Sequence, residues 1–158
     1  MLHLSFLELI FRAIPESFAL IFGMYLFSNI TLKPGKYIIS SLLLATATYS
    51  VRFLPISYGM NTIISIMVLI AIAIYINEAN LLQAVAGGIF SIILLFICEG
   101  LNMFILQSAY GDKLINIFKN PVCKTISGLP SLVAFLIILS IYKLIINRRN
   151  LRNDVRHR

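Results

Sequence analysis

Long apolar runs alternate with short polar turns along this chain. The runs are Leu2 to Thr31, Tyr37 to Arg52, Asn61 to Ile76, Leu81 to Gln107 and Leu129 to Ile146. A helix that crosses a bilayer needs roughly 20 mostly apolar residues, and most of these runs come close to that length. The pattern therefore predicts an all-α protein, a polytopic transmembrane helix bundle of about five spans.

The first run is interrupted by polar residues and by a proline. Its first half contains Glu8, Arg12, Pro15 and Glu16. Proline lacks the N–H that an interior helix position uses, so it kinks or restarts a helix. We expect either a short amphipathic helix that bends into a span or one long kinked helix, ended by the Pro-Gly turn at Leu32 to Lys36.

Two polar segments predict how the later spans are connected. Asn77 to Asn80 is a tight turn, so the third and fourth spans should form an antiparallel hairpin. Ser108 to Gly128 is the longest polar interruption. Within it, Leu114, Ile115 and Phe118 are spaced for one helical face, which predicts a short helix lying at the membrane interface.

Prolines and charges suggest where the last elements begin and end. Pro121 should break the interfacial helix, and Pro130 should lie in the first turn of the last span, where proline is tolerated. We expect a transmembrane helical domain at 1–147 and a basic tail at 148–158.

Composition agrees with a membrane protein and argues against a nucleic-acid-binding one. Hydrophobic residues make up 59% of the chain, charged residues 12%, and the mean hydropathy is +0.94, whereas soluble domains are about 25% charged. Much of the net charge of +7 lies in the tail. The tail carries Arg148, Arg149, Arg152, Arg156 and Arg158. It has no aromatic residue, and we interpret it as a topology anchor that can also contact anionic lipid.

The positive-inside rule then predicts the orientation. With the tail in the cytoplasm, Lys33, Lys36 and the turn Asn77 to Asn80 are inside, and the N-terminus and the 108–128 segment are outside. Three lysines of that outer segment oppose the rule. They are Lys113, Lys119 and Lys124. The five arginines of the tail outweigh them, particularly if the outer segment lies on the membrane surface.

Several ionisable residues lie inside the first apolar run. Glu8, Arg12 and Glu16 are four residues apart, which places them on one helical face if Pro15 leaves the register intact. Arg12 can then pair with either glutamate. One interpretation is an interfacial helix with its polar face toward headgroups or water, and the other is one wall of a polar pocket.

Glu99 lies in an apolar run, with Asn102 three residues later. An ionised residue near the bilayer centre costs about 2.5 to 3.5 kcal/mol on insertion scales. We therefore predict that Glu99 lies in the bundle interior with a donor within hydrogen-bond reach. Arg12, Arg52 or a lysine of the outer segment could supply it. We predict in particular that Arg52 pairs with Glu99 or Glu16. The pair is either structural or part of a ligand or proton site.

Catalytic and metal-binding patterns are missing from the sequence. The two histidines, His3 and His157, lie at opposite ends, and the two cysteines, Cys98 and Cys123, form no CxxC pair. No HExxH motif or phosphate-binding glycine loop occurs. We expect no metal, no cofactor, no disulfide framework and no enzymatic activity.

Small residues mark two segments where helices can approach closely. They are Ser40, Ser41 and Ala45 in the second run, and Ala84, Gly87 and Gly88 in the fourth. Small side chains let helix backbones pack against one another in membranes. We expect helix packing there rather than ligand binding.

Four short segments carry a resemblance to a known family. They are IPESF (Ile14 to Phe18), VRFLPISYG (Val51 to Gly59) with Asn61-Thr62 after it, ICEGLN (Ile97 to Asn102) and NPVCKTISGLPSL (Asn120 to Leu132). Together they resemble the N-terminal membrane sensor region of quorum-type (GHKL) histidine kinases from low-GC Gram-positive bacteria. The resemblance implies a sensor module in the bacterial plasma membrane that reports to a cytoplasmic transmitter. The sequence ends where the signalling helix and kinase domain would begin, so we expect either a truncated or a stand-alone module, or a protein unrelated to sensing.

These observations lead to three hypotheses for function. The first is a stand-alone polytopic membrane sensor or regulatory protein that binds a small ligand, a peptide or a partner helix. The second is the membrane subunit of a small-solute transporter, and the third is a structural assembly factor with no ligand. In the first two, the candidate ligand- or partner-binding residues are the embedded polar ones. They are Glu99, Asn102, Arg52, Glu16 and Arg12. The expected partners are the lipid bilayer and a signalling or transport protein.

Overall fold

The computed structural model describes the backbone of residues 12–52, 58–111 and 121–156, and the side chains of 12–51, 62–111 and 126–148. The described residues form five α-helices and no strand, which confirms the all-α class. The helices are α2 (Ile14–Phe27), α3 (Pro34–Arg52), α4 (Tyr58–Tyr75), α5 (Leu81–Tyr110) and α7 (Pro121–Arg156). Two helical stretches, Leu81–Tyr110 and Ile126–Arg148, are long and apolar enough to cross a membrane.

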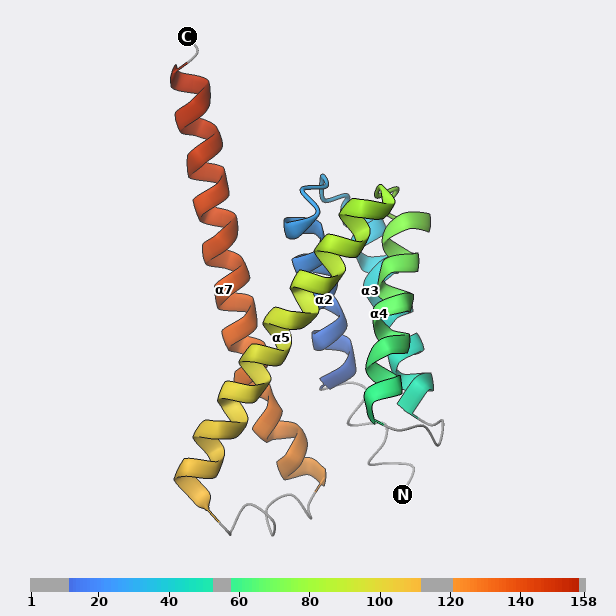
Figure 1. Cartoon of the computed structure of the whole chain (residues 1–158), viewed down its shortest axis with the longest axis vertical. Helices are drawn as coiled ribbons and strands as arrows, with labels where there is room; N and C mark the ends of the chain where they lie inside the picture. The colour runs from blue at the N-terminus through green and yellow to red at the C-terminus, as the bar shows by residue number, and fades with distance from the viewer. Residues whose placement is uncertain (1–11, 53–57, 112–120, 157–158) are drawn as a thin grey trace.

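Consecutive helices run in opposite directions (Figure 1). Helices α2, α4 and α7 run toward the end of the molecule that is uppermost in Figure 1, and α3 and α5 run toward the lower end. The upper end therefore holds the α2–α3 turn, the α4–α5 turn and the C-terminal part of α7. The antiparallel hairpin predicted around Asn77 to Asn80 is confirmed as α4 and α5.

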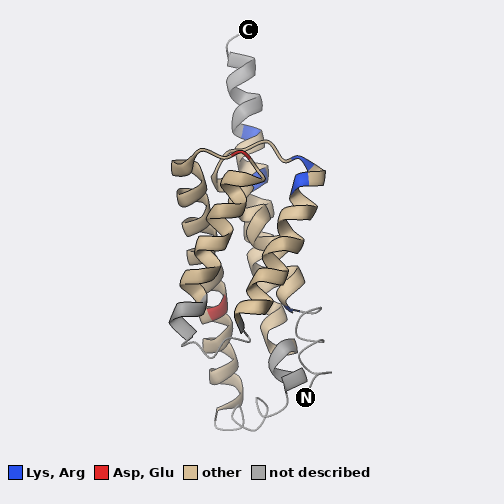
Figure 2. Ribbon diagram, turned by 90° about the vertical axis from the view of Figure 1, so that its right-hand side faces the viewer, with Lys and Arg blue, Asp and Glu red and all other residues tan. Residues whose placement is uncertain are grey.

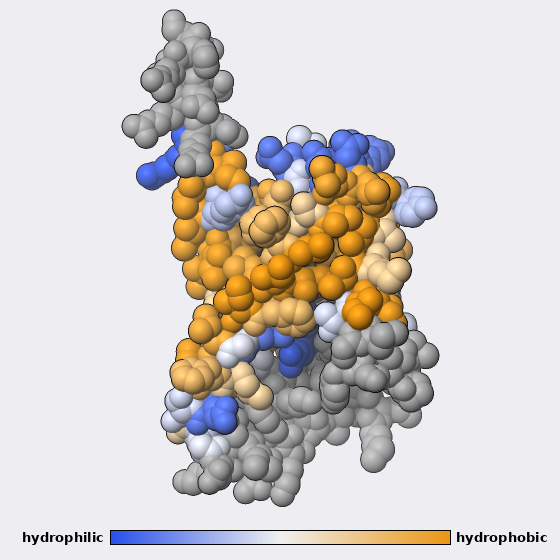
Figure 3. Space-filling view, in the orientation of Figure 1, coloured by the Kyte–Doolittle hydropathy of each residue, from blue (hydrophilic) through white to orange (hydrophobic). Residues whose placement is uncertain are grey.

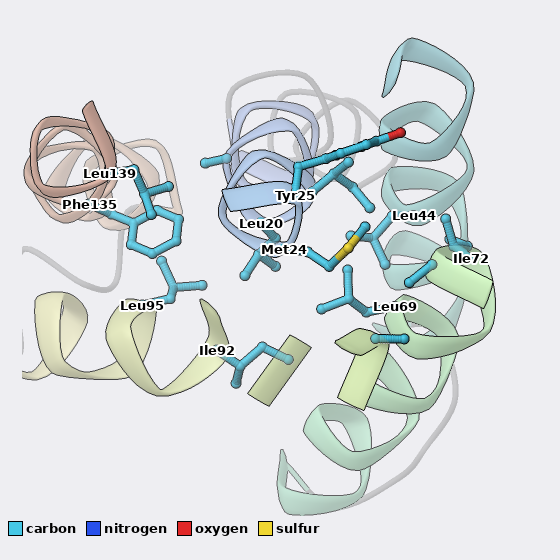
Figure 4. Close-up of a cluster of buried hydrophobic side chains, with 14 of the residues drawn as sticks. Leu20, Met24, Tyr25, Leu44, Leu69, Ile72, Ile92, Leu95, Phe135 and Leu139 are labelled. Carbon is cyan, nitrogen blue, oxygen red and sulfur yellow. The ribbon is translucent and has the colours of Figure 1, made fainter. Parts of the chain in front are cut away.

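Helix α2 lies at the centre of the bundle, packed against α3, α5 and α7. Its sequence IPESFALIFGMYLF is apolar around most of its circumference, which is typical of a helix buried on all sides. Figure 4 shows side chains from all five helices meeting around it. The largest fully buried ones are Phe135, Ile21, Met24, Leu44, Leu69 and Leu139.

Glycines allow α2 and α5 to cross at close range. A Cβ atom added at Gly87 would overlap the Ser28 hydroxyl oxygen and lie 2.9 Å from the carbonyl oxygen of Met24. One at Gly23 would lie 2.8 Å from the Ser91 hydroxyl oxygen. Close backbone approach through small residues is a common mode of helix association in membranes. The predicted helix contact at Gly87 is confirmed.

A buried hydrogen-bond network ties three elements together near the upper end. The hydroxyl groups of Tyr25 in α2 and Ser40 in α3 both donate to Oδ1 of Asn77, at 2.5 Å and 3.1 Å. Asn77 lies in the α4–α5 turn and is only 5% exposed, and its Nδ2 has no hydrogen-bond partner within the part of the chain that the structure describes. Asn77 thus anchors the turn to the bundle, which the polar sequence of the turn did not indicate.

Helix α7 differs from the expected last span. Helix α7 already begins at Pro121, and Pro130 lies well inside α7 rather than in its first turn. An interior proline removes one backbone hydrogen bond and bends the helix, and Figure 1 shows α7 changing direction along its length. The expected boundary at 147/148 also lies within α7. The predicted interfacial helix around Leu114 lies outside the described residues.

Three charged residues link α3 to the α4–α5 turn at the upper end. The Lys36 ammonium lies 2.7 Å from Oε1 of Glu78, and the Lys33 ammonium lies 3.9 Å from Oε2. Glu78 is highly exposed, so these pairs add little to stability. They do lower the pKa of the Glu78 carboxyl group below its ordinary value of 4.5, first through the Lys36 hydrogen bond and then through the charges of Lys36 and Lys33.

We expect the Glu78 carboxyl group to titrate below pH 4.5 in the folded protein. Because its folded pKa is the lower one, the interaction stabilises the fold above the ordinary pKa and is lost as the pH falls through the folded value. Carbon-13 NMR of labelled glutamate would measure this titration. Lys36→Met should raise the Glu78 pKa more than Lys33→Met, and equal midpoints in the wild type and Lys36→Met would contradict the assignment.

Candidate functional site

A pocket of about 490 Å³ opens between α5 and α7 toward the lower end of the bundle. Pockets of roughly 300 to 1,000 Å³ are typical of small-molecule sites. Figure 3 shows hydrophilic surface in a hollow below the apolar band. The lining residues are Phe96, Glu99, Gly100, Asn102, Met103 and Leu106 from α5, Ser127, Gly128 and Ser131 from α7, and Arg12 just before α2.

The sequence of α5 places its pocket residues on one side of the helix. Phe96, Gly100 and Met103 are three or four residues apart, the spacing of neighbours on one helical face. A Cβ atom at Gly100 would meet nothing within 4 Å, so the missing side chain leaves open space. Across the pocket, a Cβ atom at Gly128 would lie 3.1 Å from Nη1 of Arg12. Gly128 thus lets the guanidinium group approach the backbone of α7.

Arg12 and Glu99 form the charged wall of the site, and Glu16 lies beside Arg12. Nη2 of Arg12 donates to Oε1 of Glu99 at 3.1 Å, and Nε of Arg12 lies 3.9 Å from Oε2 of Glu16. The Arg12 and Glu99 side chains are 24% and 31% exposed. The strong contact joins the start of α2 to α5. The weaker one lies along the α2 face, as the i, i+4 spacing of Arg12 and Glu16 predicts.

Two further hydrogen bonds define the α7 side of the site. The side-chain amide of Asn102 donates through Nδ2 to the carbonyl oxygen of Ser127 at 2.7 Å. The Ser131 hydroxyl group donates to the carbonyl oxygen of Gly128 at 2.7 Å, within α7. The first bond links α5 to α7, and the Arg12–Glu99 pair links α5 to α2. Polar contacts at the pocket therefore cross-link three helices.

The structure brings together four of the five candidate residues from the sequence: Arg12, Glu16, Glu99 and Asn102. The predicted donor for Glu99 is confirmed as Arg12, one of the three alternatives. Glu99 is less buried than expected, because it lines an open pocket. Arg52 ends α3, but its side chain lies outside the described residues, so its pairing stays a prediction. Glu8 lies outside them too.

The sequence interpretation missed the contribution of α7. Ser127, Gly128 and Ser131 line the pocket, but hydropathy placed the first two in a loop. Their spacing of three to four residues was the available signal, since small residues so spaced favour close helix contact. Phe96 was also missed, because an aromatic residue in an apolar run is typical of a lipid-facing or core position.

The polar groups of this site are a guanidinium, a carboxylate and an amide. Across the described residues, no group of three or more histidine, cysteine, aspartate and glutamate side chains could hold a metal ion. The guanidinium, carboxylate and amide groups can bind a charged or hydrogen-bonding ligand. No protein-family model, curated protein or solved structure matches the chain. The resemblance to the sensor region of quorum-type histidine kinases therefore stays a prediction.

Proposed function

We propose that this chain is a multi-pass protein of the bacterial plasma membrane that acts as a stand-alone sensor or regulatory protein. In this proposal the five helices are spans, and the upper end of Figure 1, with the C-terminal part of α7, is cytoplasmic. The pocket between α5 and α7 then opens toward the outer side of the membrane. It is the ligand site, and α7 transmits its occupancy to a cytoplasmic partner.

The surface of the described residues supports membrane embedding. Figure 3 shows a band of hydrophobic surface over α5 and α7. Exposed members on α5 include Phe90, Ile93, Ile97 and Phe104, and those on α7 include Ile137, Ile141 and Leu144. In Figure 2 most basic residues of the described part gather at the upper end, and the helix bodies are largely free of charge. Soluble monomers rarely expose an apolar area of this kind, whereas lipid covers it.

Reporter fusions test the orientation. Fusions at Glu78 and after Arg158 should give high green-fluorescent-protein and low alkaline-phosphatase signals, because both positions are cytoplasmic in this proposal. A fusion at Asp112 should give the reverse pattern. Phosphatase activity at Arg158 would contradict the proposed orientation and move the pocket to the cytoplasmic side.

One observation carries the sensor proposal: the pocket and the far end of the molecule share a single helix. Helix α7 lines the pocket at Ser127, Gly128 and Ser131 and continues without a break to Arg156. Its 36 residues span about 54 Å at 1.5 Å per residue. A ligand that separates α5 from α7 must also shift α7, and the shift reaches the opposite end of the bundle.

Core packing favours this proposal over the transport hypothesis. The side chains of Ile21, Met24, Phe135 and Leu139 are fully buried in the core of the bundle. A solute in the pocket would have to displace them to cross between the helices. A sensor needs no such path, because it transmits a helix displacement from one side of the membrane to the other and no solute passes through the bundle.

The test uses a deletion strain of the source bacterium, complemented with the wild type, Glu99→Gln or Gln107→Asn. Gln107 is an exposed residue of α5 that does not line the pocket, so its variant is the matched control. We expect Glu99→Gln to reproduce the transcript profile of the deletion at a normal membrane level, and Gln107→Asn to restore the wild-type profile. An unchanged profile in the deletion strain contradicts a regulatory role. A changed solute content without a transcript change favours transport.

A further inference from the structure

The hydrogen-bonding groups of the pocket indicate what kind of ligand it takes. The Asn102 amide must place Nδ2, not Oδ1, against the Ser127 carbonyl oxygen, because only a nitrogen can donate there. Its Oδ1 accepts no hydrogen bond from any described residue. The Ser131 hydroxyl proton is engaged with the Gly128 carbonyl oxygen. The Asn102 amide nitrogen and the Ser131 hydroxyl group thus each donate to a backbone carbonyl group of α7, and Oδ1 of Asn102 remains as an acceptor.

The charged wall also favours a ligand that donates hydrogen bonds. The Arg12 guanidinium faces Glu99 at 3.1 Å and Glu16 at 3.9 Å, and its Nη1 lies against Gly128. An anion approaching this guanidinium group would meet two carboxylates beside it. A carboxylate has about four acceptor sites, and Arg12 contacts only Oε1 of Glu99. Glu99 is also the more exposed member of the pair, so the pocket offers a carboxylate more readily than a cation.

The rest of the lining is apolar and continues onto the outer surface of α5. Phe96 and Met103 both line the pocket and are exposed, and Leu106 lies one turn further along the helix. Exposed apolar residues of α5 surround them, including Ile97 and Phe104. An apolar tail can therefore lie against Phe96 and Met103 while the rest of the molecule remains in the lipid phase. Such a ligand enters sideways from the membrane.

From these three observations, the geometry points to a membrane-dissolved amphiphile with a protonated primary amine as the ligand. Its ammonium group donates to the Glu99 carboxylate and to Oδ1 of Asn102, and its alkyl tail packs on Phe96 and Met103. This inference rests on the proposed function, since it assigns a ligand class to the same pocket. A single-chain amine and the ammonium head of an aminophospholipid share this chemistry.

Native mass spectrometry and a binding titration on the full chain in phosphatidylcholine nanodiscs test the inference. The probes are dodecylamine, dodecyltrimethylammonium, which has the charge but no N–H, and dodecanoate. We expect one dodecylamine to bind saturably, at least tenfold more tightly than either other probe. Nanodiscs that contain phosphatidylethanolamine distinguish the two sources: weaker apparent dodecylamine binding there identifies the phospholipid as a competitor, and unchanged binding identifies the single-chain amine.

Two variants connect binding to the pocket. Glu99→Gln should weaken dodecylamine binding at least tenfold, and Gln107→Asn should leave it unchanged. Because Glu99→Gln also alters the contact with Arg12, Gly100→Leu is a second variant. A Cβ atom at Gly100 would meet nothing within 4 Å, so the leucine side chain takes up open space of the pocket, retains both charged residues and should also abolish binding. Equal binding by wild type and Gly100→Leu overturns the inference.

The outcomes separate this inference from the proposed function. Saturable binding of dodecanoate instead of dodecylamine overturns the amine assignment and leaves the pocket as a ligand site. No binding of any probe also overturns the amine assignment, and the regulatory proposal is then decided by the Glu99→Gln transcript profile alone. If dodecylamine binds more tightly than the other two probes, and if Glu99→Gln and Gly100→Leu both weaken that binding, the result supports both the amine assignment and the proposed function.

Discussion

Replacing Arg12 by alanine should lower the free energy of unfolding by about 2 to 3 kcal/mol, because Glu99 loses the donor that neutralises it. Stripping one member from a fully buried ion pair typically costs about 3 to 5 kcal/mol. The expected value is smaller here, since Arg12 and Glu99 are 24% and 31% exposed. Unfolding in mixed detergent micelles, followed by circular dichroism, measures the change.

A double variant and an exposed ion pair provide the controls. Arg12→Ala with Glu99→Gln should recover at least half of the loss, because the neutral amide no longer needs a cation, and the difference between single and double variants gives the coupling. Lys36→Ala, which breaks the contact with the highly exposed Glu78, should change stability much less. If Arg12→Ala is as mild as Lys36→Ala, the Arg12–Glu99 pair does not hold α2 to α5.

The second large effect is expected at the crossing of α2 and α5. Gly87→Ala should destabilise the bundle by about 2 to 3 kcal/mol, the upper part of the usual range for overpacking. The new methyl group would overlap the Ser28 hydroxyl oxygen and crowd the Met24 carbonyl oxygen, which belongs to the backbone and cannot rotate away. Thermal unfolding of the purified variant in detergent measures the loss.

The adjacent glycine provides a matched control. A Cβ atom at Gly88 would meet only Ile70 and Leu69, both at ordinary contact distances of 3.5 Å. Alanine is favoured over glycine inside a helix by about 1 kcal/mol, so Gly88→Ala should be neutral or slightly stabilising. If the Gly87 and Gly88 variants behave alike, the close approach of α2 and α5 does not limit stability.

The helices and part of the site were predictable because both follow from local sequence. Apolar runs indicated the described helices, and a four-residue turn correctly indicated the α4–α5 hairpin. The i, i+4 spacing of Arg12 and Glu16 placed them together. The choice of Arg12 as the donor for Glu99 was open, because it depends on the start of α2 packing beside α5 and α7. Hydrophobic periodicity identifies a buried face but not the helix that covers it.

The features that could not be predicted depend on tertiary packing. Asn77 has the residue type and turn position of a solvated residue, and only the approach of Tyr25 and Ser40 makes it the centre of a buried network. The start of α7 was placed too late because Cys123, Lys124 and Thr125 interrupt the apolar pattern. Hydropathy marks where lipid can cover a helix, and backbone hydrogen bonding can continue beyond that point.

The bend at Pro130 makes α7 a lever. Pro130 adjoins the pocket residue Ser131, so the fulcrum lies beside the pocket, and the arm runs on to Arg156. Roughly 26 residues at 1.5 Å each give an arm of about 39 Å. A tilt of about 5° at the fulcrum would therefore carry the tip of the arm sideways by about 3 Å, more than the shifts of about 1 to 2 Å that helices make at switching subunit interfaces. A small change in tilt beside the pocket would therefore become a larger displacement at the far end of α7, where a partner protein could respond to it.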